Sequence, residues 1–179
     1  MQRISLAKIK ERDVLRWVKE GKIFLYPTDT VYGLGCDATN KEAVARLRKM
    51  KGAGHPFSVI VPSKRWATKH LYVKDFLSKL PGPYTIIALK RNPKFLFWVS
   101  NKRSLGIRIP DHPFTKIIQK TGKPFITTSA NISGQSPIKS PDELLQAIKP
   151  DIIIDAGMLS GRPSDIIDIT GSKPKIIKR

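Results

Sequence analysis

Tyr26-Pro-Thr-Asp-Thr-Val-Tyr-Gly-Leu-Gly-Cys-Asp37 directly follows Ile23-Phe24-Leu25, an apolar run that predicts a β-strand. This motif therefore starts where a strand ends. Its hydroxyls, carboxylate and bare glycine N–H groups suit a small anionic or zwitterionic ligand at a strand edge. The alternative is a polar turn between two strands, the more frequent outcome for an isolated stretch of this type. Three further polar clusters in the same chain favour the ligand site.

The composition is that of one folded domain spanning residues 1–179, with 40% hydrophobic and 26% charged residues. The charge balance is unusual, because 33 Lys and Arg against 14 Asp and Glu give a net charge of +19. Polyanions such as nucleic acid or nucleotide phosphates are the natural partners of such a chain. A heat-adapted lysine-rich surface is the alternative, but it normally raises glutamate together with lysine.

Cys36 is the only cysteine, which excludes a disulfide within the chain and a zinc cluster built from thiols. This usage predicts a cytoplasmic protein. The N-terminus lacks the apolar core of a signal peptide, and no apolar run approaches the ~18 residues of a membrane span. No histidine lies near Cys36 in sequence, so we interpret it as a small packing residue.

Apolar spacing and capping residues predict the helices, and short apolar runs bounded by Gly or Pro predict the strands. Phe95–Val99 is apolar on every side and fits either type, whereas Ser140-Pro-Asp-Glu143 is a strong helix start. The irregular alternation of elements favours an α/β fold, a twisted mixed β-sheet flanked by helices. Helices are expected over 11–20, 41–50, 63–70, 73–80 and 113–121, and strands over 22–26, 57–61, 84–90, 105–109, 124–127, 152–154, 165–169 and 175–177.

Lys49 and Lys51 stand just before a glycine-containing basic loop, where two ammonium groups could hold a triphosphate. A solvated helix end, where cations are favourable, explains them equally well. The chain has no G-x-x-x-x-G-K-[ST] sequence, which excludes a Walker-type phosphate loop. Gly33-x-Gly35 lacks the rest of a dinucleotide fingerprint.

Arg108 lies in a predicted strand whose neighbours Ile107 and Ile109 face the other way, so it could grip a carboxylate or phosphate with its guanidinium fork. A surface arginine is the default alternative. No histidine is spaced with other ligands as metal sites require, and no protein metal site is predicted. We interpret His70 and His112 as structural.

Thr127-Thr-Ser-Ala-Asn-Ile-Ser-Gly134 follows a strand and offers hydroxyls and an amide in tandem. Such a run makes either a shelf of hydrogen-bond donors and acceptors or an Asx or Ser/Thr turn. Ser164 and Asp165 form a smaller cluster of the same type.

Five motifs, in order, give the chain a family resemblance. They are Tyr26–Gly35, the basic loop after Lys49, Pro81-Gly-Pro-Tyr-Thr85, Gly106-Ile-Arg-Ile-Pro-Asp-His-Pro113 and Thr128-Ser-Ala-Asn-Ile-Ser-Gly134. Through these five motifs the sequence resembles the YrdC/TsaC family of threonylcarbamoyl-AMP synthases. The resemblance implies a YrdC-like sheet with a concave basic face. It also implies that L-threonine, bicarbonate and ATP are converted to threonylcarbamoyl-AMP and pyrophosphate, for threonylcarbamoyladenosine modification of tRNA.

The resemblance also implies roles for individual residues. Lys49 and Lys51, at the family's K-x-R motif, are expected to act in catalysis and on the nucleotide. The expected substrate-binding residues are Thr28, Tyr32, His55, Arg108, Thr128 and Ser164, and the other nucleotide-binding residues are Thr85, Ser129, Asn131, Ser133 and Lys178.

Four positions depart from the family pattern. Lys51 and Lys178 stand where the family has arginine, so neither can form a guanidinium fork. His55 stands where lysine or asparagine is usual, and Leu80 replaces the tryptophan before Pro-Gly-Pro. The extra C-terminal domain of longer relatives is not present in this sequence.

Mg²⁺ is expected to arrive with ATP, bound to its phosphates and not to a dedicated protein site. Further expected partners are the downstream threonylcarbamoyl transferase and RNA or tRNA, with no membrane. Two other functions stay open. One is a non-catalytic RNA-binding module, and the other is a divergent nucleotide hydrolase of the same fold. Thr28, Arg108 and Ser129-x-Asn131 argue against the pure RNA binder, which has no need of an amino-acid pocket.

Overall fold

The computed structural model describes residues 1–52, 54–132 and 135–178, and its strands form one ten-stranded sheet in the order β1-β8-β2-β3-β7-β4-β6-β5-β9-β10. The pairing is mixed, with β1–β8, β2–β8, β4–β6 and β5–β9 parallel and the other pairs antiparallel. The strands are β1 Gln2–Ser5, β2 Phe24–Tyr26, β3 Gly33–Gly35, β4 Ser58–Ile60, β5 Tyr84–Leu89, β6 Ser104–Arg108, β7 Phe125–Ser129, β8 Ile152–Asp155, β9 Asp165–Asp168 and β10 Lys175–Ile177.

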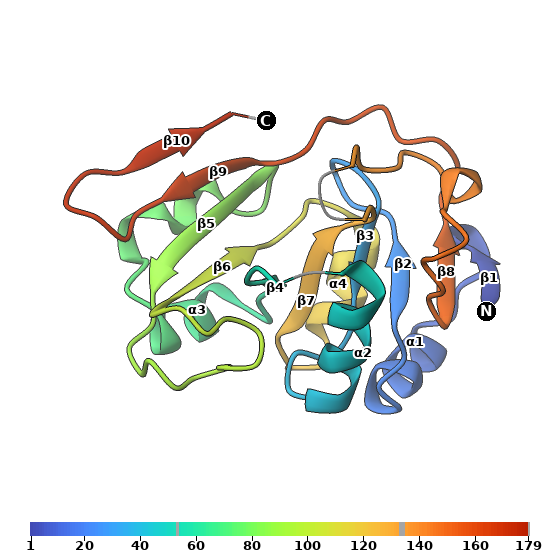
Figure 1. Cartoon of the computed structure of the whole chain (residues 1–179), viewed down its shortest axis with the longest axis horizontal. Coiled ribbons are helices and arrows are strands. Elements are labelled where there is room, and N and C mark those ends of the chain that lie inside the picture. The colour runs from blue at the N-terminus through green and yellow to red at the C-terminus, as the bar shows by residue number, and fades with distance from the viewer. Residues whose placement is uncertain (53, 133–134, 179) are drawn as a thin grey trace.

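Within the described residues, four α-helices and three 3-10 helices connect these strands. The α-helices are α1 Glu11–Lys19, α2 Lys41–Lys51, α3 Lys64–His70 and α4 Pro113–Gln119, and the 3-10 helices are Leu6–Lys8, Lys74–Lys79 and Pro141–Glu143. The N-terminus lies at the β1 end of the sheet and the C-terminus follows β10, the opposite edge strand (Figure 1).

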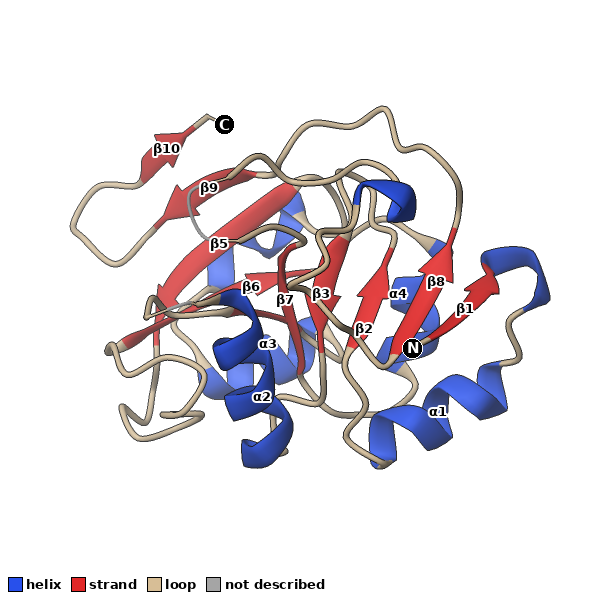
Figure 2. Ribbon diagram, turned by 45° about the vertical axis from the view of Figure 1, so that its right-hand side comes forward, coloured by secondary structure: helices blue, strands red, loops and turns tan. Residues whose placement is uncertain are grey.

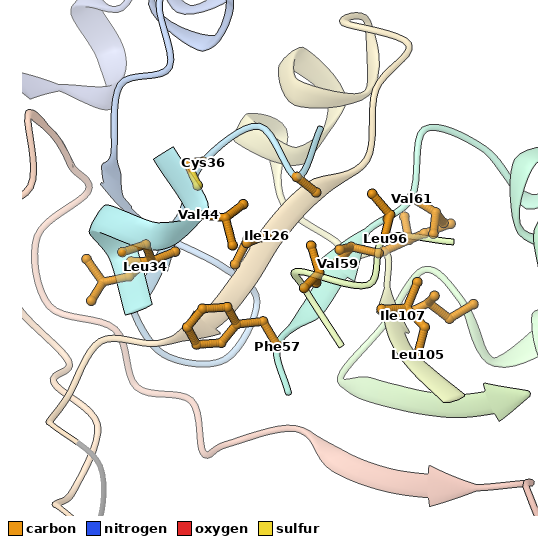
Figure 3. Packing of buried hydrophobic residues seen from close by; sticks show 14 of the residues in the cluster. Leu34, Cys36, Val44, Phe57, Val59, Val61, Leu96, Leu105, Ile107 and Ile126 are labelled. Atoms are coloured by element: carbon orange, nitrogen blue, oxygen red, sulfur yellow. The ribbon is translucent and has the colours of Figure 1, made fainter. Parts of the chain in front are cut away.

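The sheet is covered by a separate apolar core on each face. Alternation along β2 shows the division, because Leu25 joins one core while Phe24 and Tyr26 join the other. The larger core packs α2 and α3 against the sheet. Figure 3 shows Val44 of α2 beside Leu34 and Ile126 of the sheet. The smaller core packs α1 and α4 on the opposite face, so α2 lies in front of the sheet and α4 behind it (Figure 2).

The predicted helix ends are confirmed where capping residues mark them. The Asn40 side chain accepts a hydrogen bond from Ala43 N and begins α2, and Gly52, with φ +59°, ends it. Gly21, with φ +71°, follows α1 in the same way. The single cysteine is fully buried in the larger core, as expected of a packing residue, and burial raises the pKa of the Cys36 thiol.

The helix expected after Ser140 is wrong, because the chain makes only the 3-10 turn Pro141–Glu143. Ser140 caps that turn, but Glu143 accepts from Lys139 N and Leu144 adopts extended angles. A capping signal fixes the first turn only, and the extended angles of Leu144 end the helical conformation there.

Two strands were not predicted. β1 is mostly exposed and lacks alternation, and β3 is the three-residue run Gly-Leu-Gly inside the opening motif. Glycines are depleted in strands, but Gly35 is needed here because a Cβ would lie 1.9 Å from Ile126 O. Phe95–Val99, which the sequence left undecided, is neither helix nor strand but a series of turns.

Candidate functional site

A cavity of about 250 Å³ lies on the sheet face where α1 and α4 do not cover β4, β5 and β6. Its polar and apolar lining comes from both halves of the sheet. The lining residues are Thr28, Thr30, Val31, Tyr32, Gly33, His55, Pro56, Phe57, Ser58, Thr85, Ile87, Arg108, Thr127, Thr128, Ser129, Pro163, Ser164 and Ile166.

Strand alternation explains why hydroxyls collect in this cavity. On β7, Phe125 packs in the smaller core, and Thr127 and Ser129, two and four residues later, share its face and reach the cavity. On β5, Thr85 lines the cavity while Ile86 is buried in the larger core. The smaller core and the cavity are thus neighbouring parts of one sheet face.

Residues 26–37 fit both alternatives that the sequence left open. They form a turn between two strands, and they also line the cavity. Thr28 Oγ1 donates to Val31 O at 2.7 Å, accepts from Thr30 N at 3.1 Å and lies 2.9 Å from Thr30 Oγ1. A hydroxyl has one donor and two acceptor positions, so these contacts use all of them. In this structure Thr28 shapes the loop that carries Thr30, Val31 and Tyr32.

Arg108 is buried at the cavity and not at the surface, so the alternative of a surface arginine is wrong. Its Nη2 donates to Asp29 Oδ1 at 3.0 Å and to Thr30 Oγ1 at 3.2 Å. The other carboxylate oxygen of Asp29 accepts from Asp111 N at 3.1 Å. The guanidinium is thereby fixed between β6 and the motif loop.

The connection from β8 to β9 crosses above β2 and β3 and forms a third wall (Figure 1). The Tyr32 hydroxyl donates to Gly157 O and accepts from Ala156 N, both at 2.9 Å, and burial raises its pKa. Gly161 lies so close to the motif that a Cβ would be 2.2 Å from Thr30 O. The connection then delivers Ser164, whose Oγ lies 2.8 Å from Thr85 Oγ1.

Lys51 lies beneath the loop after β7 and does not line the cavity. Its Nζ donates to Ser129 O at 2.6 Å, to Asn131 O at 2.8 Å and to Asn131 Oδ1 at 3.0 Å. Ser129 Oγ also donates to Asn131 Oδ1 at 2.7 Å. Burial lowers the pKa of Lys51 to about 8. Lys51 therefore organises Ser129 and Asn131, and of these three only Ser129 is part of the lining.

The structure brings eight of the predicted site residues to one cavity and leaves four described ones outside it. Lys49 is exposed on the last turn of α2, and Lys178 is exposed beyond β10. Ser133 lies outside the described residues. The eight in the lining are Thr28, Tyr32, His55, Thr85, Arg108, Thr128, Ser129 and Ser164, and the four outside are Lys49, Lys51, Asn131 and Lys178.

Sequence reasoning left several contributors unassigned. Asp29 was noted in the motif without a role, yet it pairs with Arg108 with only 10% of the Arg108 side chain and 12% of the Asp29 side chain exposed. Ser58 and Thr127 carried the signal of alternation along their strands. Gly161 had none, because only the fold shows that the connection passes against Thr30.

The sequence also predicted that the protein has no metal site of its own and no membrane-spanning helix. Within residues 1–52, 54–132 and 135–178, no group of three His, Cys, Asp or Glu side chains is placed to hold a metal ion. His112 instead caps α4 through Nδ1, which accepts from Phe114 N at 3.2 Å. In the same part of the chain, no helix has the length and apolarity to cross a membrane.

Comparison with known proteins gives consistent matches over nearly the whole chain. Residues 16–179 match the family model Sua5_yciO_yrdC, described as "Telomere recombination". A protein of Methanocaldococcus jannaschii is 37% identical over 94% of this chain and 86% of its own length. The threonylcarbamoyl-AMP synthase of Serratia proteamaculans is 32% identical over 83% of this chain and 85% of its own length.

A solved structure agrees with these matches. P. abyssi Sua5 complexed with L-threonine superimposes with a TM-score of 0.81 at 28% identity, and the match covers 98% of this chain. The chain spans 56% of the length of that Sua5 chain. The similarity therefore concerns one part of a longer protein in that case, and nearly full length in the two preceding cases.

Proposed function

Since this chain belongs to the Sua5/YciO/YrdC family, we propose that it is a threonylcarbamoyl-AMP synthase, which makes threonylcarbamoyl-AMP and pyrophosphate from L-threonine, bicarbonate and ATP. The product supplies the threonylcarbamoyl group for modification of tRNA. A relative named threonylcarbamoyl-AMP synthase at 32% identity and a relative solved with L-threonine support this function.

The observation that carries the proposal is the buried Arg108 among hydroxyl groups in one cavity. A guanidinium held in place by Asp29 is the group that best pairs with the carboxylate of an amino acid. Thr30 and Ser164, which line the same cavity, offer partners for the hydroxyl and amine of threonine.

The size of the cavity limits what it holds. Sites for drug-sized ligands are commonly about 300–1,000 Å³, and this cavity is about 250 Å³. It therefore suits the amino acid, its carbamate and the innermost phosphate. We propose that Thr85 and Ser129 contact the nucleotide where it enters the cavity, and that the rest of ATP extends outward with its outer phosphates toward the exposed Lys49.

The chemistry needs placement more than a strong base. The deprotonated threonine amine combines with bicarbonate, losing water, to give a carbamate. A carbamate oxygen then attacks the α-phosphorus of ATP, and the bond to the β-phosphate oxygen breaks as pyrophosphate leaves. In-line alignment and charge neutralisation supply most of the catalysis in such phosphorus transfers. The part of this chain that lines the cavity supplies hydroxyls and a guanidinium, which suit that task.

Mg²⁺ enters the proposal with ATP. The described residues offer no cluster of three metal-ligating side chains, and both oxygens of Asp29 are already engaged. This fits an ion that keeps waters and binds mainly to phosphates, where it would neutralise charge on the leaving pyrophosphate. A downstream transferase would then take the adenylate product.

The test is pyrophosphate release by the purified chain with ATP and Mg²⁺, in the presence and absence of L-threonine and bicarbonate. A synthase requires both substrates, and the product carries threonine and carbon from bicarbonate. Release that is indifferent to threonine would identify a nucleotide hydrolase. A folded chain that binds RNA but releases no pyrophosphate would be the non-catalytic module. D-threonine serves as a control for a chiral amino-acid pocket.

A further inference from the structure

Ser58 begins β4, the strand that lies between β7 and β6 in the sheet. The next residue, Val59, packs in the larger core together with Ile107 of β6 and Ile126 of β7 (Figure 3). Because side chains alternate along a strand, Ser58 points to the other face of the sheet, where it lines the cavity. The floor of the cavity therefore carries a hydroxyl between β7 and β6.

The residue beside Ser58 on β6 leaves room for this hydroxyl. Ser58 pairs with Gly106 of β6 on one side and with Thr127 of β7 on the other. A Cβ at position 106 would lie only 2.2 Å from Ser58 Oγ. The hydroxyl thus occupies the space that a side chain at position 106 would fill, and Gly106 is what allows it to lie there.

Ser58 differs from most hydroxyls of the cavity because the protein does not use its proton. The hydroxyls that are bonded within the protein are those of Thr28, Thr30, Thr85, Ser129 and Ser164. Ser58 Oγ makes no hydrogen bond with any residue in the ranges 1–52, 54–132 and 135–178. A hydroxyl has one donor and two acceptor positions, so Ser58 can donate to a ligand.

The proposed function leaves bicarbonate without an assigned donor. Arg108 is assigned to the carboxylate of threonine, and Thr30 and Ser164 to its hydroxyl and amine. Bicarbonate must reach the amine inside the same cavity, and its oxygens need hydrogen-bond donors there, because a buried anion without partners is costly. The unused hydroxyl of Ser58 is such a donor.

We propose that Ser58 binds bicarbonate, and then the carbamate made from it, by donating its hydroxyl proton to one of their oxygens. In the step between them, the amine lone pair forms the new C–N bond and the C–OH bond of bicarbonate breaks. The leaving hydroxide takes a proton from the nitrogen and departs as water. Ser58 keeps its own proton throughout. This inference rests on the proposed synthase function.

A neutral donor suits an oxygen that must afterwards attack phosphorus. A cation in direct contact would bind the carbamate more tightly, but it would also withdraw charge from the attacking oxygen. Arg108, two residues beyond Gly106 on the same face of β6, supplies positive charge to the cavity as a whole. Ser58 can therefore position the oxygen without neutralising it.

The test is pyrophosphate release by Ser58→Ala, with bicarbonate, threonine and ATP varied in turn in buffer freed of dissolved carbon dioxide. A hydrogen bond to a charged group is strong enough that we expect the bicarbonate KM to rise about tenfold or more. The threonine and ATP KM should change by less than about twofold, and kcat at saturating bicarbonate should be kept. The Tm should not fall, because no hydrogen bond within the described part of the protein is lost.

Two further variants separate hydrogen bonding from other effects of the substitution. Ser78→Ala removes an exposed hydroxyl from the 3-10 helix Lys74–Lys79, outside the cavity lining, and should behave like the unaltered chain. Ser58→Cys keeps a side chain of similar size, but a thiol is a weak donor, so its bicarbonate KM should stay raised. Full recovery in Ser58→Cys would show that volume matters and not donation, and would overturn the inference.

Two other kinetic results would overturn it as well. They are a bicarbonate KM in Ser58→Ala equal to that of the unaltered chain, and an increase confined to the threonine KM, which would assign Ser58 to the amino acid.

A binding measurement keeps the inference distinct from the proposed function. Carbon NMR of isotopically labelled bicarbonate, with threonine present and ATP absent, should show broadening of the bicarbonate signal by the unaltered chain and by Ser78→Ala. We expect Ser58→Ala to lose that broadening, and equal broadening would contradict the role of Ser58. An unaltered chain that releases no pyrophosphate would refute the synthase, whereas this measurement would still decide whether Ser58 binds bicarbonate.

Discussion

Arg108 and Asp29, 79 positions apart in sequence, meet at 3.0 Å, and each has little exposed surface. Asp29 uses one carboxylate oxygen for the guanidinium and the other for Asp111 N. A single carboxylate therefore ties the motif loop to both the end of β6 and the chain that leaves it. Asp29 of the motif loop orients the Arg108 guanidinium, and Arg108 in turn holds the motif loop in place.

Asp29→Asn is expected to weaken threonine binding although the side chain at this position is assigned no contact with substrate. The amide keeps the shape but removes the charge that orients Arg108, so the threonine KM should rise about tenfold, or about 1.4 kcal/mol. The ATP KM should change little, because Arg108 is assigned to the amino acid. Steady-state kinetics with each substrate varied in turn gives the comparison.

Arg108→Lys provides the companion measurement. Lysine keeps the positive charge in a buried position but loses the planar fork, so its threonine KM should rise at least as far as that of Asp29→Asn. Equal increases in the KM of ATP and threonine in both variants would contradict the assignment of Arg108.

Lys51 should make stability depend on pH in a way that Lys51→Met abolishes. Burial lowers its pKa to about 8 in the folded protein, whereas an unfolded lysine titrates near about 10.4. Between these values the unfolded chain binds more protons, so the contribution of Lys51 to the free energy of unfolding rises with pH, by up to about 3 kcal/mol. Below pH 8 both states are protonated and the contribution is constant.

Urea unfolding at a pH below 8 and at one near 10 measures this effect as the difference between the unaltered chain and Lys51→Met. Subtracting the variant removes the titration of the other lysines and tyrosines. The same pH dependence in both proteins would show that the pKa of Lys51 is not lowered in the folded protein.

Tyr32→Phe should loosen the connection between β8 and β9. The phenol both donates to Gly157 O and accepts from Ala156 N, so its removal should cost about 1–3 kcal/mol. We expect a Tm lower by several degrees and faster chymotrypsin cleavage near Met158, which is 70% exposed. Tyr72→Phe, which alters an exposed ring, is the control and should change neither value.

Gly161→Ala should disrupt the cavity from a position outside its lining. The added Cβ would lie 2.2 Å from Thr30 O, so either the connection or the motif loop must shift. We expect turnover to fall by at least about tenfold with little change in far-UV circular dichroism. Gly171→Ala is the matched control, because its nearest atom is 3.9 Å away, and it should behave like the unaltered chain.

Lys49→Ala is expected to reduce turnover without destabilising the fold, since Lys49 is exposed at the end of α2. The physical reason is loss of a cation that we propose lies near the outer phosphates of ATP, and the ATP KM or kcat should report it. Lys19→Ala removes an equivalent exposed cation at the end of α1, which lies near the beginning of α2 and not near the Lys49 end, and it should have no effect. Equal turnover in the two variants would remove Lys49 from the mechanism.

The sequence predicted the fold best where local signals and burial agree. Asn40 and Gly52 mark the two ends of α2, because a capping side chain and a left-handed glycine act on only a few neighbouring residues. Ser140 carried an equally good cap, but no helix followed the first turn, since propagation depends on packing. The exposed strand β1 has its place only through parallel pairing with β8, which no local pattern reveals.

The types of residue in the site could be predicted from the sequence, but the contacts that these residues make with one another could not. Arg108 and Ser129 converge because their strands lie in one sheet, as their motifs suggested. Thr28 and Lys51 were expected to touch ligands, and the structure adds that both also bond to other parts of the protein. Such supporting roles depend on distances between segments that are remote in sequence, and spacing along the chain does not encode them.

β7 has an uncommon position, because its first half pairs with β4 and its last residues pair with β3. It is thus the seam between two sub-sheets, and a ligand held by Thr30 on one side and Arg108 on the other spans that seam. A ligand bound in the cavity should therefore stabilise the pairing between the two sub-sheets. Amide protons along the β4–β7 ladder, which lies beside the cavity, would then exchange with deuterium more slowly when the ligand is bound.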